Sequence, residues 1–300
     1  MDQGREDLGR EGRVIRALVA VAILVAVPAA AAQTGIAARV AHDADLRNDP
    51  QVVRYLALTG EPALREVLPR GDVAEPFAYE PEWITGPNGL PVLRFASLAT
   101  NQRLISWFLH FPPQDEVYAR YCILIEDDVA DGMTERGVKL PGLAGDEVSW
   151  RMEHGPVMPG SRGLYAALDY IYSADSGAGY GAIRSMNVSF KAGLWYVIEQ
   201  YVKLNAPGRS DGVGKVWING QLAWESDNVR YRDKPASLMD HVHVNVYHGG
   251  MGLPKGPMHY RIAGIAVAKA YIGPPPELAA SIKPEPMLPR TGRVPDKLPR

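Results

Sequence analysis

The sequence predicts an all-β fold, a sandwich or barrel of antiparallel strands, over residues 76–273. Short runs rich in β-branched and aromatic residues alternate there with turns rich in Gly, Pro, Asn and Asp. No run between residues 90 and 272 has the apolar spacing of a long amphipathic helix. The pair Asn219-Gly220 joins the runs KVWI and QLAWE, and Asn-Gly is the strongest short signal for a two-residue hairpin.

The predicted strands cover residues 90–95, 105–111, 117–126, 164–173, 185–190, 194–204, 214–218, 221–226, 242–247 and 259–272. The segment GVKLPGLAG at 137–145 is expected to be an irregular loop. Before the strands, residues 33–75 predict a short helical lead-in, because DPQVVRYLALTG and EPALREVL have helical periodicity between breakers. After them, residues 274–300 predict a disordered tail with eight prolines in 27 residues.

Residues 1–32 have the features of a signal peptide. Arg13 and Arg16 precede the apolar run ALVAVAILVAVPAAAA, which ends in small residues and predicts cleavage near Ala32. The run is short for a membrane span, which needs about 20 apolar residues. We therefore expect a secreted or periplasmic protein without stable membrane insertion, and an uncleaved membrane anchor is the alternative.

Composition and charge exclude few functions. The 300 residues are 46% hydrophobic and 22% charged, as in ordinary globular proteins. A net charge of -2 argues against a nucleic-acid partner, which would usually require a basic balance. Cys122 is the only cysteine, so no internal disulfide is expected, and its place in a predicted strand indicates a buried, inert thiol.

The segment HVHVNVYHGG at 241–250 alternates with the period of a strand that has one face against a core. The polar side consists of His241, His243, Asn245 and Tyr247. The other side consists of Val242, Val244 and Val246. An ordinary solvent-facing side carries Lys, Glu, Thr and Ser, so this polar side is expected to bind a polar ligand.

Two histidines two apart on a strand can also ligate zinc, with His248 or His259 as a third ligand. Hydrogen bonding to a ligand is the preferred interpretation, and no metal or cofactor is expected. The motifs GxxxxGK[ST], G-x-S-x-G and H-E-x-x-H are absent. The acidic run Glu126-Asp127-Asp128 is interpreted as a solvated turn.

The order RY, EDD, GVKLPGLAG, YIY, GYG, GLWYVIEQYVKLNAPG, VWINGQL, YHGG resembles the family 14 polysaccharide lyases, which cleave alginate, and their glucuronan-lyase relatives. The resemblance covers about residues 90–272. It implies a β-jelly roll of two antiparallel sheets, concanavalin-like, whose concave face binds an acidic polysaccharide. It also implies β-elimination of a uronate-containing polymer.

The resemblance assigns roles to individual residues. Lys139 of KLPGL matches a lysine important for cleavage, and Tyr170 and Tyr172 match a YxY pair in the cleft. Arg120-Tyr121 matches an RY pair on a cleft-facing strand. His243, Asn245, Tyr247 and His248 are added as residues that bind substrate.

One departure favours an alternative. Tyr165 and Ala167 stand where the family has a serine and an arginine. A non-catalytic carbohydrate-binding module on the same scaffold is therefore the main rival, and a hydrolase or a metal-dependent enzyme is the second.

The chemistry itself needs a base for the C5 proton, a cation or hydrogen-bond donors at the uronate carboxylate, and an acid for the departing O4. A tyrosine can serve as base or acid, and a neighbouring lysine favours its phenolate form. Lys139 with Tyr170 or Tyr172 supplies such a pair without a metal.

Overall fold

The computed structural model describes residues 35–60, 81–97, 103–133, 137–146, 149–156, 164–172, 182–248 and 253–282. In β7, in β8 and in parts of β4 and β9 the description covers the backbone alone. The chain divides into two units, Met1–Ala31 and Ala32–Arg300, and all described residues belong to the second. The predicted signal peptide and the EPALREVL segment lie outside the described residues. No helix in the described part is long and apolar enough to cross a membrane.

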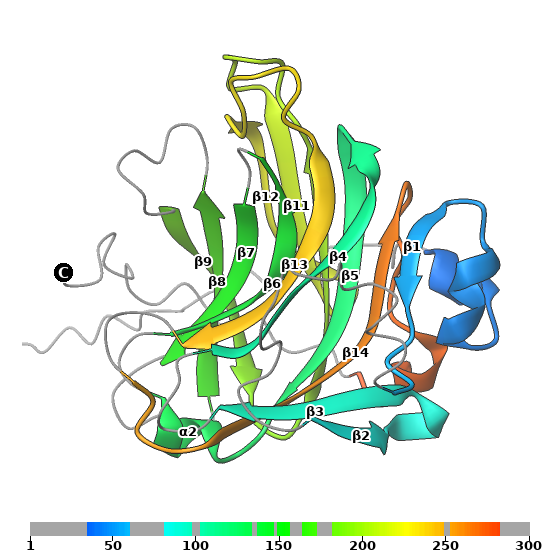
Figure 1. The fold of residues 1–300 in the computed structure, drawn as a ribbon, viewed down its shortest axis with the longest axis vertical. Helices are drawn as coiled ribbons and strands as arrows, with labels where there is room; N and C mark the ends of the chain where they lie inside the picture. The colour runs from blue at the N-terminus through cyan, green and yellow to red at the C-terminus, as the bar shows by residue number, and fades with distance from the viewer. Residues whose placement is uncertain are drawn as a thin grey trace, which may run out of the picture. The chain divides into compact units, whose positions relative to one another are not determined.

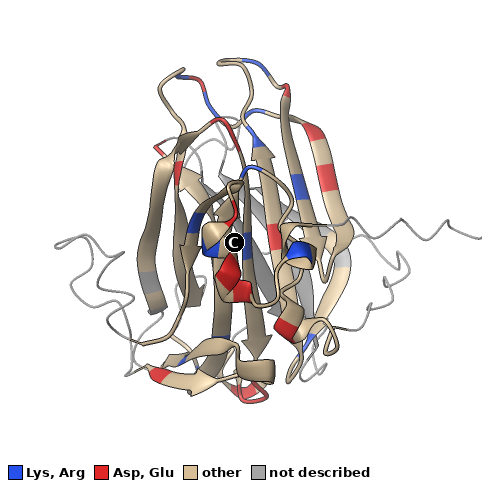
Figure 2. Cartoon of the chain, turned by 90° about the vertical axis from the view of Figure 1, so that its right-hand side faces the viewer, with Lys and Arg blue, Asp and Glu red and all other residues tan. Residues whose placement is uncertain are grey.

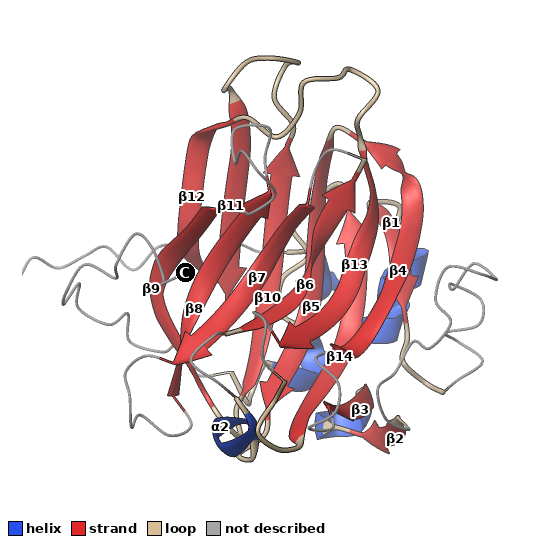
Figure 3. Ribbon diagram, turned by 60° about the vertical axis from the view of Figure 1, so that its left-hand side comes forward, coloured by secondary structure: helices blue, strands red, loops and turns tan. Residues whose placement is uncertain are grey.

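The described strands form two antiparallel sheets (Figures 1 and 3), which confirms the predicted fold class. The larger has eight strands. Its order is β12 (Gln221–Val229), β11 (Gly212–Ile218), β10 (Trp195–Lys203), β5 (Glu116–Ile125), β14 (Met258–Ala268), β3 (Pro91–Ser97) and β2 (Glu82–Thr85), with β1 (Val52–Leu56) also paired to β14.

The smaller sheet has six strands and carries most of the candidate residues. Its order is β4 (Arg103–Gln114), β13 (Met239–His248), β6 (Val138–Gly145), β7 (Ser149–Pro156), β8 (Leu164–Tyr172) and β9 (Ala182–Lys191). Short helical turns complete the described residues: η1 (Ile36–Arg39), η2 (Asp43–Asn48), η3 (Pro87–Gly89), α2 (Val129–Gly132) and η4 (Pro276–Leu278).

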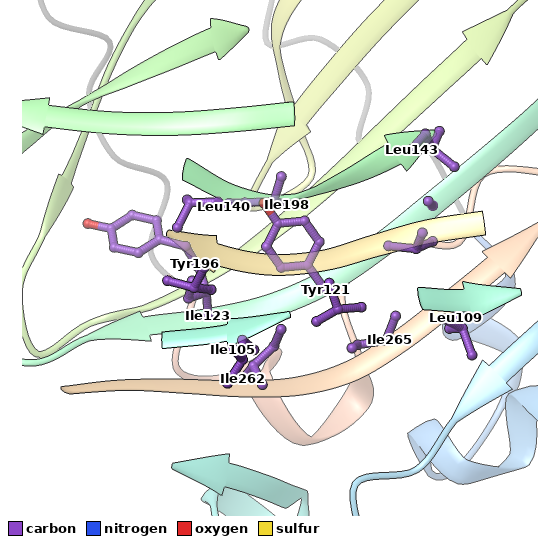
Figure 4. Packing of buried hydrophobic residues seen from close by; sticks show 14 of the residues in the cluster. Ile105, Leu109, Tyr121, Ile123, Leu140, Leu143, Tyr196, Ile198, Ile262 and Ile265 are labelled. Carbon is purple, nitrogen blue, oxygen red and sulfur yellow. The ribbon is translucent and has the colours of Figure 1, made fainter. Parts of the chain in front are cut away.

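The core lies between the two sheets and is built from alternate residues of each strand. On β13, Val242, Val244 and Val246 are at most 2% exposed, as the alternation predicts. They share one apolar cluster with Tyr121 of β5 and Ile198 of β10, which belong to the other sheet. Figure 4 shows side chains from both sheets meeting in this cluster. Burial of this apolar surface is the main force that holds the sheets together.

The segment expected to be an irregular loop, residues 137–145, is instead the central strand β6, paired with β13 and β7. Leu140 and Leu143 are fully buried in the core between the sheets (Figure 4). Pro141 has no N–H to donate, and the register with β7 shifts between Lys139 and Gly142. This bulge breaks the period of two, which is why the alternation did not reveal the strand.

The lead-in prediction was wrong for residues 52–56. They form strand β1, which pairs with β14 from Val52 opposite Ala268 to Leu56 opposite Ile265. Valine and tyrosine favour strands, and the neighbouring strand supplies hydrogen-bond partners that override a weak helical pattern. The preceding residues form only the short turns η1 and η2. Figure 2 faces this side, where acidic and basic residues occur together on the short helical turns.

The turn signals are confirmed where they were strongest. Asn219 and Gly220 adopt φ values of 53° and 78° and connect β11 to β12, with Ile218 opposite Gln221. Both residues tolerate this left-handed conformation, which matches the twist of the paired strands. The tail prediction was wrong at its start, because η4 is packed on the protein and Leu278 is fully buried. Residues 283–300 lie outside the described residues.

Candidate functional site

The polar side of β13 lies on the face of the six-stranded sheet that is turned away from the core. Because Val242, Val244 and Val246 point into the core, alternation places His241, His243, Asn245 and Tyr247 on the opposite face. The imidazoles and the phenol are half-buried, and Asn245 is 7% exposed. We call this face the polar face.

Lys139 joins these residues through strand pairing. Its backbone partner in β13 is Tyr247. The Lys139 ammonium nitrogen lies 6.0 Å from the centre of the Tyr247 ring, within range of a cation–π interaction. Lys139 is half-buried, while its neighbour Leu140 is fixed in the core. The amine is therefore held on the polar face by a paired strand, and the sequence prediction of a loop lysine is corrected.

Tyr170 and Tyr172 lie on β8, two strands from β6. Tyr170 pairs with Arg151 of β7, and Tyr172 pairs with Ser149. Arg151 is two residues from Glu153, the β7 partner of Lys139. Strand spacing of about 4.8 Å and a rise of about 3.3 Å per residue separate the backbones of Lys139 and Tyr170 by roughly 12 Å. The side chains of both tyrosines lie outside the described residues.

The amide and the imidazoles of β13 form local contacts. The Asn245 amide nitrogen lies 3.0 Å from Nε2 of His243. Nδ1 of His241 lies 2.5 Å from a carboxylate oxygen of Asp240. The ring centres of His241 and His243 are 6.4 Å apart. Each imidazole thus has an identified polar neighbour.

The neighbouring strand β4 adds Phe108 and His110, which the sequence prediction missed. Their backbone partners in β13 are His243 and His241. The Phe108 ring centre lies 4.7 Å from each of those two imidazole centres. The signal was present in ISWFLHF, where Ile105, Trp107 and Leu109 alternate with the polar-face residues and are fully buried.

Arg120, expected to face the cleft, lies in the larger sheet and is fully buried. Its guanidinium group donates to Asp43 at 2.6 Å and to the carbonyl oxygens of Gly264 and Gly273. It is on the face of that sheet opposite the core between the sheets, and η2 covers it. The prediction is therefore wrong, and Arg120 anchors the lead-in. Cys122, on the same face, is buried as predicted, and burial raises its pKa to about 12.

The prediction that His248 binds substrate also disagrees with the structure. It is fully buried. It lies an even number of residues from Val242, Val244 and Val246, so it shares their side of the strand. The alternation that assigned the polar face already contained this signal.

One group of three metal-ligating side chains comes together among the described residues, Glu126, Asp128 and His259, with ligand atoms within 4.8 Å of one another. It lies at the larger sheet, away from β13. Burial raises the pKa of Glu126, but hydrogen bonds from Arg94 and Arg261 outweigh burial and lower the pKa to about 2. The two guanidinium groups neutralise this carboxylate and repel a cation, so the cluster is an ion-pair network.

Known proteins share this fold and part of this sequence. Residues 170–253 match the family described as Polysaccharide lyase 14. No curated protein matches the sequence. The marine PL-14 alginate lyase from Aplysia kurodai has 14% identity and a TM-score of 0.55, over 72% of this chain and 98% of that chain. A mutant of the alginate lyase Aly36B in complex with alginate trisaccharide has 17% identity and a TM-score of 0.50, over 59% of this chain and 81% of that chain.

At these identities the solved structures establish a shared fold. The matched family segment contains β13 with His243, Asn245 and Tyr247, and it begins at Tyr170 of β8. The resemblance indicated by the sequence is therefore confirmed: this chain is a β-jelly roll with the fold of the PL-14 alginate lyases, and its residues 170–253 match the Polysaccharide lyase 14 family.

Proposed function

We propose that this protein is an exported polysaccharide lyase that cleaves a uronate-containing polysaccharide, alginate-like or glucuronan-like, by β-elimination. The observation that carries the proposal is the position of Lys139 on the polar face, next to Tyr247 and in the same sheet as Tyr170 and Tyr172. Export is inferred from the signal-peptide features of residues 1–32.

The substrate class follows from the chemistry of the polar face together with the family match. Lys139 supplies a cation for a uronate carboxylate, and the imidazole, amide and phenol groups of β13 are donors and acceptors for sugar hydroxyls. The alginate trisaccharide bound to Aly36B supports an anionic polymer as ligand.

In the proposed reaction, a tyrosine phenolate of the Tyr170–Tyr172 pair takes the proton from C5 of the uronate. Lys139 neutralises the carboxylate, which stabilises the enolate-like state as negative charge moves onto it. The electron pair left at C5 forms the C4–C5 double bond, and the C4–O4 bond breaks. The tyrosine that took the C5 proton, now a hydroxyl, donates a proton to the departing O4. The products are an unsaturated uronate and a new chain end.

The proposal is tested by incubating the purified protein with a panel of uronate polysaccharides and recording ultraviolet absorbance of the unsaturated product. Alginate and glucuronan are expected to include a substrate. Neutral polysaccharides are the control, because they lack the acidified C5 proton. A panel with no unsaturated product from any polymer contradicts the lyase proposal.

A carbohydrate-binding module remains the second candidate, because Tyr165 and Ala167 stand on β8 where the resemblance predicts a serine and an arginine. Such a module would bind the polymer in a pull-down or calorimetric assay and release no unsaturated product. The absorbance assay and the binding assay together separate the two candidates.

A further inference from the structure

Three histidines gather around one phenylalanine at the β4–β13 end of the polar face. The Phe108 ring centre is 4.7 Å from His241, 4.7 Å from His243 and 5.9 Å from His110. The ring centres of His110 and His241 are 5.6 Å apart. His110 is exposed, and the other two histidines are half-buried. We call these four residues the histidine cluster.

Among the described side chains, a carboxylate lies beside the cluster. Asp240, on the same strand, contacts His241. On the other side of β13, the β6 partners of His241 and His243 are Ala144 and Gly142, which carry no charge. A protonated His241 next to Asp240 is locally neutral, so additional positive charge has to come from another imidazole of the cluster.

The Asn245 amide can form a hydrogen bond with either protonation state of His243. Its amide nitrogen faces Nε2 of His243 at 3.0 Å, which suits a neutral imidazole that accepts a hydrogen bond there. Its Oδ1 atom is buried and has no hydrogen-bond partner among the described residues. Rotation of the amide by half a turn would place Oδ1 against Nε2, where it would accept a hydrogen bond from the N–H of a charged imidazole.

The cluster is continuous with the proposed active site. Tyr247, the partner of Lys139, is four residues from His243 on β13, which corresponds to about 13 Å along the strand. A polymer lying along the polar face would reach both places. Its carboxylates, like those of Asp and Glu, are ionised above about pH 5.

We propose that His110, His241 and His243 form a proton-gated subsite for a further carboxylate of the polyuronate chain. Its ligand class rests on the proposed function. Three imidazolium groups at these separations repel one another, so they do not all become charged without an anion between them. A bound carboxylate offsets the repulsion, and the Phe108 ring favours the cations beside it. Binding and proton uptake are therefore coupled.

The charges of the cluster and of the polymer determine the direction in which affinity changes with pH. Imidazoles ordinarily titrate between about pH 5 and 8. As the pH falls through this range, the cluster gains positive charge while the polymer keeps its negative charge. Affinity is therefore expected to rise as the pH falls, by about tenfold between pH 8 and pH 5.5 for two additional cations near the surface. A metal site would behave in the opposite way, because protons compete with the metal for imidazole.

The test is calorimetric titration of a saturated alginate oligosaccharide at about pH 5.5 and about pH 8, in buffers with different ionisation enthalpies. The Tyr170→Phe Tyr172→Phe background prevents turnover. The wild-type cluster is expected to bind more tightly at the lower pH and, near neutrality, to take up protons on binding. His110→Gln combined with His243→Gln should abolish both effects. His110→Lys should restore tight binding at the higher pH, because its charge is permanent.

His42→Gln is the matched control, because His42 is 71% exposed on the lead-in and belongs to no described part of the polar face. It should leave the pH dependence unchanged. The same oligosaccharide with reduced carboxyl groups should show no pH dependence. Melting curves of all variants establish that they are folded.

Affinity that is equal at both pH values, or proton uptake that survives the double variant, would overturn the inference. So would absence of binding at both pH values, or binding that requires Zn²⁺ and is lost with a chelator. Proton-coupled binding without an unsaturated product in the wild type would overturn the proposed function alone. Elimination without proton-coupled binding would overturn the subsite alone.

Discussion

The Lys139 ammonium nitrogen stands 6.0 Å from the centre of the Tyr247 ring, and the two residues are backbone partners on adjacent strands. This pair fixes the cation on the outer face of the six-stranded sheet. The strand that carries it is held from behind by Leu140 and Leu143, both fully buried. A cation presented by a paired strand loses little conformational entropy when it binds an anion.

Replacing Lys139 should impair catalysis much more than folding. If Lys139 neutralises the uronate carboxylate, Lys139→Ala should lower kcat about a hundred- to a thousandfold, the usual effect of removing one electrostatic donor from a transition state. The free energy of unfolding should change by less than about 1 kcal/mol. Lys203→Ala, an exposed lysine on β10 of the other sheet, is the control. Wild-type turnover in Lys139→Ala would mean that the site is elsewhere.

Replacing each of the two tyrosines of β8 should have a different kinetic effect. Phenylalanine at the tyrosine that takes the C5 proton should lower kcat by a factor similar to that of Lys139→Ala, because the phenolate is lost. Phenylalanine at the other should mainly raise KM. Steady-state kinetics of Tyr170→Phe and Tyr172→Phe on the best polymer measure both. Unchanged kinetics in both variants would remove the pair from the mechanism.

Arg120 should behave as a structural residue. Arg120→Ala leaves Asp43 buried without its cationic partner and should lower the free energy of unfolding by about 3–5 kcal/mol. Folded enzyme should retain its kcat and KM. Urea unfolding measures the first effect and steady-state kinetics the second. Asp43→Asn, which keeps the volume of the side chain, provides a second variant if Arg120→Ala does not fold.

An increase in KM for Asp43→Asn, with stability unchanged, would instead place this pair in substrate binding. That outcome would restore the role that the sequence resemblance assigned to Arg120.

Glu199 predicts a pH dependence of stability. Burial raises its pKa from 4.5 to about 7, although backbone N–H groups of Ile272 and Gly273 and the charge of Arg120 act in the opposite direction. The folded protein therefore holds a proton that the unfolded chain has lost. The contribution of Glu199 to the free energy of unfolding is therefore fully present below about pH 4.5. It falls by about 3 kcal/mol as the pH rises to about 7.

Glu199→Gln should remove this component of the pH dependence, because an amide does not titrate. Urea unfolding of wild type and variant at about pH 5 and pH 8 gives the free energy of unfolding at each pH, and the change between the two pH values is compared. Glu225→Gln is the control, because the Glu225 side chain is 57% exposed. If the free energy of unfolding changes with pH equally in wild type and Glu199→Gln, Glu199 is not the source of the pH dependence.

The sequence by itself determined the strands whose alternation is regular. In β13 the period of two was sufficient to assign one face to the core, and Asn219-Gly220 was sufficient to locate a hairpin. The local preference and the tertiary environment agree in these segments, so the pattern is readable without the fold. The resemblance carried by KLPGL and the YIY pair also came from the sequence alone.

Only the tertiary structure decided what each strand face contacts. Alternation gives Arg120 a side of its strand, but it does not say that η2 and Asp43 cover that side. Strand β6 was missed because Pro141 and a bulge interrupt its period, and because its partner β13 comes from a distant part of the chain. Pairing and burial are non-local, so a position such as Lys139 acquires its neighbour Tyr247 only when strands 108 residues apart in sequence are brought together by the core behind them.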